Sequence, residues 1–145
     1  MTGTNLGSRS ERGSAVIELA VLGALCFGLL IEALVVFGQV QRAALATTAA
    51  ARDAGRAVVV ASTEPEAAWR ARAAVVAAER DHGLADDAIE LRVTGVRDRG
   101  ALLRVEARAE VRVLDVPLLA RFLPGPIIPV VAAHRVRLER FASIP

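Results

Sequence analysis

Residues Ala15 to Val40 form an almost unbroken apolar run, and this run restricts the chain more than any other feature of its sequence. Only Glu18, Glu32 and Gln39 interrupt it. A helix needs about 20 apolar residues, each rising about 1.5 Å, to cross the hydrocarbon core of a bilayer. A chain of 145 residues is too small to bury a helix that is apolar on all sides. The sequence therefore predicts a transmembrane helix over about residues 15–40.

The helical pattern continues past this run, because the following segment is rich in alanine and contains no proline before Pro65. Gly55 makes the helix less stable by about 1 kcal/mol relative to alanine at that position. One continuous helix from about Ser14 to Ala61 is nevertheless predicted. Residues 1–13 are polar and rich in Gly and Ser, and are predicted to be disordered. We therefore divide the chain into a leader (1–13), an N-terminal helix (14–62) and an extracytoplasmic body (63–145).

A second, shorter helix is predicted over about Glu64 to Asp81. Ser62 or Thr63 can cap its first turn, and Gly83 followed by Leu84 is typical of a helix C-terminus. One helical face carries Trp69, Ala73, Val76 and Ala77. We expect Trp69 to anchor this face on the first helix or on the sheet.

The hydrophobic period then changes from 3.6 to 2, which predicts strands. Apolar residues alternate with Arg, Glu and Thr in two segments joined by the turn sequence RDRG, namely 89–94 and 103–113. A third strand is predicted around His134, Val136 and Leu138. The connection DVPLLARFLPGPIIP (115–129) is predicted not to be regular strand, because proline cannot donate to a sheet ladder. The expected fold is α+β, with a long N-terminal transmembrane rod, a short helix and a three-stranded antiparallel sheet.

Three types of N-terminal segment are compatible with an apolar run near the start of the chain. A secretory signal peptide could be cleaved after Ala44-Leu45-Ala46, but its apolar region spans about 7–15 residues, and this run is longer and contains two acids. An uncleaved signal anchor explains the span but does not explain why Glu18 lies in it.

The segment Gly13-Ser14-Ala15-Val16-Ile17-Glu18 resembles the class III signal of type IV prepilins. With Glu32 and the Phe37-Gly38 pair further on, it is similar to the TadE/TadG-type minor pilins, or pseudopilins, of the tight-adherence (Flp, type IVb) pilus. The resemblance covers about residues 12–60. In that family an acid usually comes directly before Phe-Gly, whereas Glu32 lies five residues before Phe37.

This resemblance implies a pilin-like protein of the cytoplasmic membrane that crosses it once. Its N-terminus would lie in the cytoplasm and its body outside, and it would be incorporated in an extracellular pilus. A prepilin peptidase would cut between Gly13 and Ser14, and Glu18 would then meet the new α-amine of a neighbouring subunit. Glu32 is a second assembly candidate. The expected partners are the peptidase, other pilins through the N-terminal helix, and membrane lipid.

Two alternatives remain open. The chain could be an uncleaved single-pass scaffold subunit of a secretion or pilus-assembly complex, or a soluble binding domain released after Ala46. In each case we expect no enzyme activity, no cofactor and no metal site. His82 and His134 lie on different predicted elements, and Cys26 is the single cysteine. We expect no nucleic-acid partner, because every basic residue is an arginine interspersed with acids and none forms a basic block.

Overall fold

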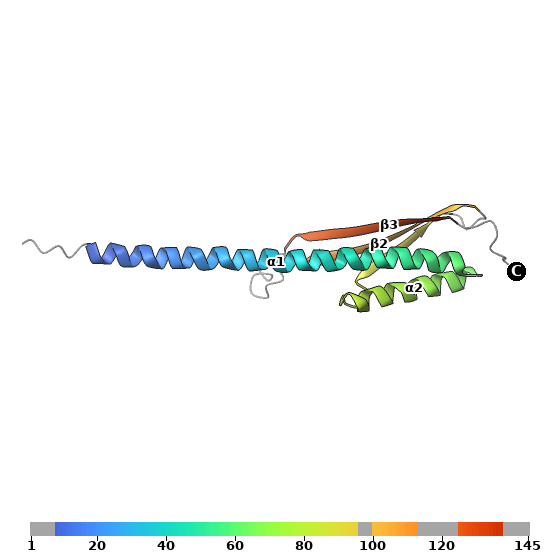
Figure 1. Cartoon of the computed structure of the whole chain (residues 1–145), viewed down its shortest axis with the longest axis horizontal. Helices are drawn as coiled ribbons and strands as arrows, with labels where there is room; N and C mark the ends of the chain where they lie inside the picture. The colour runs from blue at the N-terminus through green and yellow to red at the C-terminus, as the bar shows by residue number, and fades with distance from the viewer. Residues whose placement is uncertain (1–7, 96–99, 113–124, 138–145) are drawn as a thin grey trace, which may run out of the picture. The chain divides into compact units, whose positions relative to one another are not determined.

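A computed structural model describes residues 8–95, 100–112 and 125–137, with side chains from Ser14 onward. It contains two helices, α1 (Ser8–Val60) and α2 (Glu64–Asp81), followed by the strands β1 (Ile89–Thr94), β2 (Leu102–Arg112) and β3 (Ile127–Arg137) (Figure 1). The strands form one antiparallel sheet in the order β1-β2-β3. The predicted long N-terminal helix, short second helix and three-stranded antiparallel sheet are therefore confirmed.

The helix α1 contributes to two compact units. The first unit is Met1–Val35 and the second is Val36–Pro145. The boundary between them falls inside α1, whereas the sequence placed the start of the body at residue 63. The part of α1 that follows the apolar run is thus a structural component of the body.

The start of α1 also differs from the prediction. The helix begins at Ser8, six residues before the expected Ser14, so part of the predicted disordered leader is helical. Arginine and glutamate are good helix formers, and adding residues to an existing helix avoids the cost of nucleation. The rest of the leader, residues 1–7, lies outside the described residues.

Both ends of α2 are capped as the sequence predicts. The Thr63 hydroxyl accepts from the backbone N–H of Glu66 (3.4 Å), and the Glu66 carboxylate accepts from the N–H of Ser62 (2.9 Å). At the other end Gly83 has a φ of 64°, and the N–H of Leu84 donates to the carbonyl of Glu79 (2.8 Å). These bonds satisfy backbone groups that the helix leaves unpaired at its ends.

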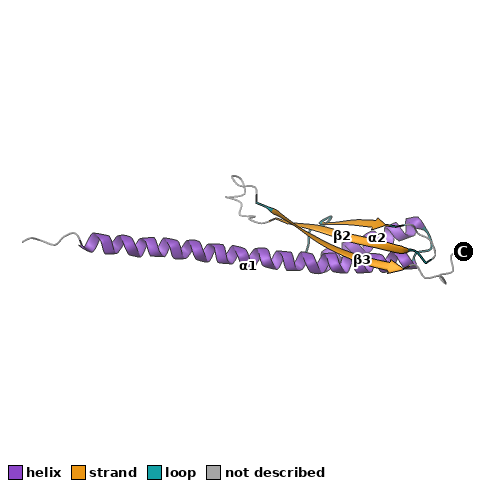
Figure 2. Cartoon of the chain, turned by 90° about the horizontal axis from the view of Figure 1, so that it is seen from above, coloured by secondary structure: helices purple, strands orange, loops and turns teal. Residues whose placement is uncertain are grey.

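The core of the second unit lies between the sheet and the two helices, and alanine dominates it (Figure 2). Of the 17 buried apolar residues in the described part of the chain, 11 are alanines. From α1 the core takes mainly Ala43, Ala46, Ala50, Ala54 and Val58, and from α2 it takes Ala67, Ala71, Val75 and Ala78. The predicted alternation in β2 is confirmed from Leu103 to Val111, with Val105 fully buried. Val113 lies outside the described residues.

Gly55 shows how closely α1 approaches the sheet. A Cβ atom at this position would lie 2.8 Å from Cγ2 of Val136 and 3.1 Å from Cδ2 of His134, both on β3. Real Cβ atoms essentially never approach another atom as closely as 2.8 Å, and 3.1 Å is tighter than most real contacts. Gly55 therefore weakens the helix locally but permits the contact between helix and sheet.

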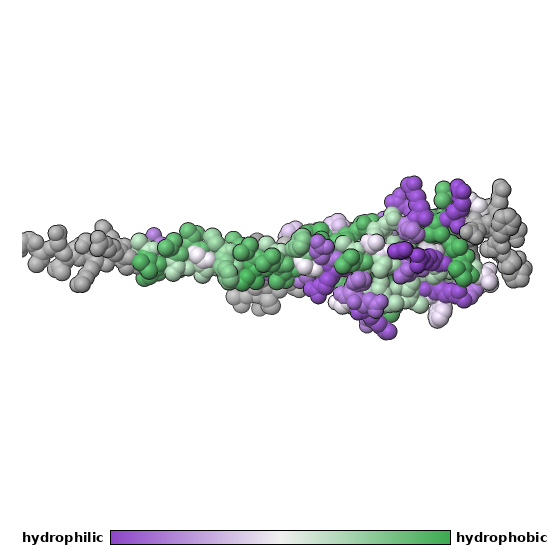
Figure 3. Space-filling model, in the orientation of Figure 1, coloured by the Kyte–Doolittle hydropathy of each residue, from purple (hydrophilic) through white to green (hydrophobic). Residues whose placement is uncertain are grey.

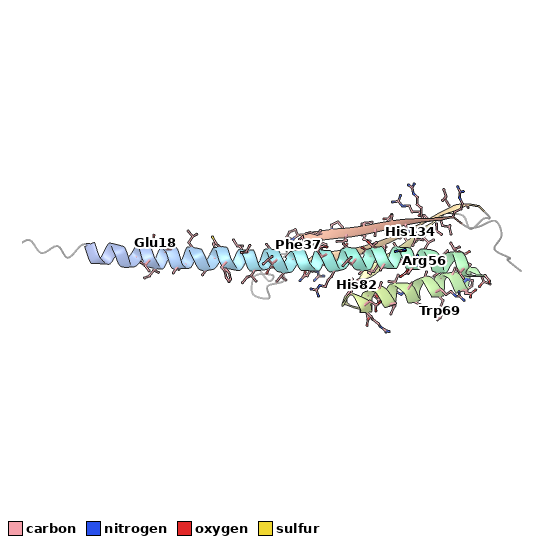
Figure 4. The ribbon with its side chains drawn as sticks, viewed as in Figure 1. Glu18, Phe37, Arg56, Trp69, His82 and His134 are labelled. Atoms are coloured by element: carbon pink, nitrogen blue, oxygen red, sulfur yellow. The ribbon has the colours of Figure 1, made fainter. Side chains whose placement is uncertain are left out.

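The predicted buried face of α2 is wrong. Trp69 is 71% exposed and does not anchor the helix, while Ala73 and Ala77 are also exposed. Trp69 points away from the core (Figure 4). The helix instead buries a stripe of small residues that begins at Ala67 and Ala71. Because alanines bring the layers close together, the interface leaves no room for an indole ring.

The third strand also differs from the prediction, because β3 begins at Ile127 and includes Pro129. Pro129 is tolerated because β3 is an edge strand, where a missing N–H donor need not break a ladder bond. The other parts of the predicted connection and turn, residues 115–124 and 97–99, lie outside the described residues, as does Leu138. His134 and Val136 are half-buried on the inner side of β3, as the alternation predicts.

Candidate processing and assembly site

The predicted cleavage position between Gly13 and Ser14 lies within α1, more than one turn after its start at Ser8. The peptide bond is therefore helical in the full-length chain. Helix ends open at a lower free energy than helix interiors, so this bond lies where local unwinding is least costly. A peptidase that acts here would leave a helix that begins near Ser14.

Ser14 and Glu18 are in direct contact. The Ser14 hydroxyl donates a hydrogen bond to Oε1 of Glu18 at 3.1 Å, across one turn of the exposed helix surface. Glu18 projects from the N-terminal part of α1 (Figure 4). After cleavage it would lie at the end of the first turn, where a negative charge complements the helix dipole. The structure thus shows in contact the two residues that the sequence singled out, Ser14 beside the predicted cleavage position and the acid Glu18.

Glu32 lies 14 residues after Glu18 on the same helix. With 3.6 residues per turn, the two acids are about 21 Å apart along the axis and about 40° apart around it. They therefore occupy nearly the same side of α1. Glu32 is half-buried and makes no ion pair with any residue in the described part of the chain.

The sequence around these acids contains no basic partner. No Arg, Lys or His occurs between Arg12 and Arg42. A carboxylate well inside a bilayer costs about 2.5–3.5 kcal/mol on insertion scales and is normally paired. Any cation that neutralises Glu18 or Glu32 within the apolar run must therefore come from a new chain terminus, another molecule or the lipid interface.

Apart from Glu18 and Glu32, the side chains of α1 in this region are exposed and mostly apolar. Within the described residues, one helix is long and apolar enough to cross a membrane, over Ser14–Val60. The most apolar stretch of this helix has none of its residues buried within the structure. Figure 3 shows apolar residues along the visible face of the first unit and polar residues gathered on the second. This exposure is expected of a surface covered by lipid or by another apolar helix.

Three glycines on α1 have no packing role in the described chain. A Cβ atom added at Gly23, Gly28 or Gly38 would meet nothing within 4 Å. They contrast with Gly55, where side chains of the sheet occupy the space that a Cβ atom would need. Small residues on an apolar helix allow a second helix to approach closely.

The remaining candidate residues are separated from one another. His82 caps the C-terminus of α2, and His134 lies on β3 (Figure 4). Cys26 is an exposed free cysteine in the first unit. No group of three His, Cys, Asp or Glu side chains in the described ranges is placed to hold a metal ion.

Searches of protein-family models, of curated proteins and of solved structures returned no match to the chain. The functional assignment therefore depends on Gly13, Ser14, Glu18 and the apolar surface that follows them.

Proposed function

We propose that this chain is a minor pilin, or pseudopilin, of the TadE/TadG type that takes part in assembly of a tight-adherence pilus. It is inserted in the cytoplasmic membrane through α1, cut by a prepilin peptidase after Gly13, and joined to other pilins through α1. The body, formed by the later part of α1, α2 and the sheet, lies outside the membrane. The chain is a substrate of the peptidase, not an enzyme.

One observation carries this proposal: Glu18 lies one turn from Ser14, at the start of an apolar helix without a single basic residue as far as Arg42. Cleavage after Gly13 creates a cation at Ser14. A neighbouring helix, displaced along its axis, brings that cation to Glu18 and removes the cost of a lone acid in the bilayer. The acid thereby favours the assembled state over the single chain.

A released soluble domain is disfavoured by the core. Cleavage after Ala46 would divide α1 between residues that are buried against the sheet. It would remove both Ala43 and Ala46 from the body, although both are at most 1% exposed there. The free body would then expose the alanine, valine and isoleucine side chains that now cover these positions.

An uncleaved membrane scaffold is the second candidate, and the Ser14–Glu18 contact favours it in one respect. The hydroxyl already gives the carboxylate a hydrogen-bond partner within a single chain. A hydrogen bond from a neutral hydroxyl stabilises a carboxylate less than an ammonium group does, because the charge remains uncompensated. We therefore prefer the assembly role for Glu18.

The N-terminus of the mature protein tests the proposal. Mass spectrometry of the chain isolated from native membranes should find Ser14 as the first residue. A chain that begins at Met1 or Thr2 would support the uncleaved scaffold instead. A soluble product that begins at Thr47 would support the released domain.

A further inference from the structure

A hollow of about 300 Å³ opens at the end of the second unit where α1 enters it. Gln39 and Arg42 of α1 line one wall, and Leu84, just after α2, lines a second. Glu110 and Arg112, at the end of β2, complete it. His82 marks the neighbouring end of α2 in Figure 4.

The charges around this hollow leave it basic. Arg42 and Arg112 are both exposed, and neither makes an ion pair with the residues that the structure describes. The one acid in the wall, Glu110, is already paired with Arg108, at 3.1 Å. Two arginines from separate elements therefore line one space, and the acid that lines it with them is paired with Arg108.

The position of the hollow relates it to the apolar run. Gln39 is the last polar residue within the run, which ends at Val40, and Arg42 lies about one helical turn after Gln39. In a helix that spans the membrane over about residues 15–40, these side chains occupy the level of the lipid headgroups. Arginine and glutamine donate to phosphate oxygens there, and arginine does so with a planar fork of donors.

Apolar side chains lie at the same end of the sheet. Arg112 is paired in register with Ile127, and Val111 with Ile128. Both isoleucines are exposed, Ile127 by 51%. A surface that combines arginines with exposed isoleucines has the composition of protein segments that lie at a membrane interface.

We propose that this basic hollow binds the phosphodiester of an anionic phospholipid headgroup in the leaflet from which α1 emerges. The proposal rests on the membrane span of the proposed function but does not depend on cleavage or on pilus assembly. The bound lipid would hold the end of the body that carries this hollow at the membrane surface until the chain leaves the bilayer.

Native mass spectrometry of the full-length chain in an uncharged detergent tests this site. Phosphatidylglycerol is the anionic probe, phosphatidylcholine the zwitterionic probe and inorganic phosphate the competitor. The wild type should retain phosphatidylglycerol in preference to phosphatidylcholine. The double variant Arg42→Gln/Arg112→Gln should bind phosphatidylglycerol about 30-fold more weakly, since each interfacial arginine contributes about 1 kcal/mol.

The matched control is Arg135→Gln/Arg137→Gln. These two exposed arginines lie at the far end of β3, where Arg137 is paired in register with Leu102. The control removes the same charge and should bind phosphatidylglycerol like the wild type. Circular dichroism of each variant establishes that the body remains folded.

Three results would overturn the proposal. The wild type could bind the two lipids equally well. The two double variants could lose phosphatidylglycerol binding to the same extent, or Arg42→Gln/Arg112→Gln could bind it as tightly as the wild type. If inorganic phosphate binds as tightly as phosphatidylglycerol, the hollow is a site for free phosphate and the lipid proposal is wrong. Failure of cleavage at Gly13, measured on the chain from native membranes, would affect the pilin assignment alone.

Discussion

The backbone N–H of Ile89, the first residue of β1, donates to Oε1 of Glu79, near the end of α2, at 2.9 Å. Glu79 is 1% exposed, and its second oxygen has no hydrogen-bond partner among the described residues. This bond joins the short helix to the edge strand that follows it. Because the donor is a buried backbone group, losing its acceptor leaves an unsatisfied N–H in the core.

Glu79→Ala should therefore lower the free energy of unfolding by about 2 kcal/mol, the usual effect of removing a charged acceptor from a buried donor. Glu79→Gln is the control, because it keeps an acceptor oxygen and removes the charge of an ionised carboxylate. It should be no less stable than the wild type. Thermal unfolding of the full-length chain in detergent measures both, and amide exchange at Ile89 should accelerate only in the alanine variant.

Gly55→Ala tests the approach of α1 to the sheet. The added methyl would lie 2.8 Å from Val136, so helix or strand must move. Overpacking of this kind costs about 1–3 kcal/mol, more than the roughly 1 kcal/mol gained in helix propensity. The matched variant Gly28→Ala places a methyl where nothing lies within 4 Å and should leave the unfolding midpoint unchanged or slightly raised. Equal midpoints for the two variants would contradict the helix–sheet contact.

Val105→Asp and the adjacent Arg104→Asp test the two faces of β2. Val105 is fully buried, so an aspartate there places a charge in the core and should unfold the body. Arg104 lies on the outer face and pairs with Glu106 in an exposed ion pair of 3.2 Å. Such pairs are worth at most about 1 kcal/mol, so Arg104→Asp should be mild. Circular dichroism distinguishes the outcomes, and equal damage would mean that the faces are misassigned.

Gly13→Leu should leave full-length precursor in the membrane, because a bulky side chain replaces hydrogen beside the bond to be cut. Immunoblotting of membrane fractions against the wild type measures this. Leu6→Ala, in the same leader but away from the cut, is the control and should be processed normally. Trimming of Gly13→Leu at the wild-type rate would contradict the prepilin assignment.

Glu18→Ala separates the pilin from the scaffold. Insertion should be at least as efficient as in the wild type, because the substitution relieves an intramembrane cost of about 3 kcal/mol. Cleavage should continue, but crosslinking to other pilins and pilus yield should fall at equal protein levels. Glu64→Ala, at the exposed start of α2, is a control that removes an acid outside α1. Normal pili with normal crosslinks in Glu18→Ala would favour the scaffold.

The sequence predicted most of the fold because each element has a strong local signal. The long apolar run, the capped second helix and the alternation in β2 all appear where they were expected. The buried face of α2 was not predictable in this way, because alanines occur on several faces of the helix. The face that carries Trp69 was predicted to be buried because Trp69 is large and apolar, but it is exposed. Which face packs depends on the spacing between layers, and Gly55 and the α1 alanines set that spacing.

Two further features depend on contacts between distant segments. From the sequence alone, Glu79 resembles an ordinary solvent-exposed acid on a helix. Its burial and its hydrogen bond depend on Ile89, which the fold brings next to it. Pro129 argued against a strand, and only the strand order shows that β3 is an edge where proline is accepted. Of the candidate site, the structure shows the Ser14–Glu18 contact, while the role of Glu32 stays a prediction.

The alanine-rich core has a consequence for sequence variation. In most domains, mutations that shorten a core side chain are the damaging class, but an alanine has almost nothing left to remove. Here the harmful changes should be those that add atoms, such as Ala46→Val, Ala50→Leu or Ala107→Val, because neighbouring backbones already lie close. A saturation mutagenesis screen of this body should therefore show a maximum tolerated side-chain size at each buried position. The smallest maximum should be found at the buried alanines of α1.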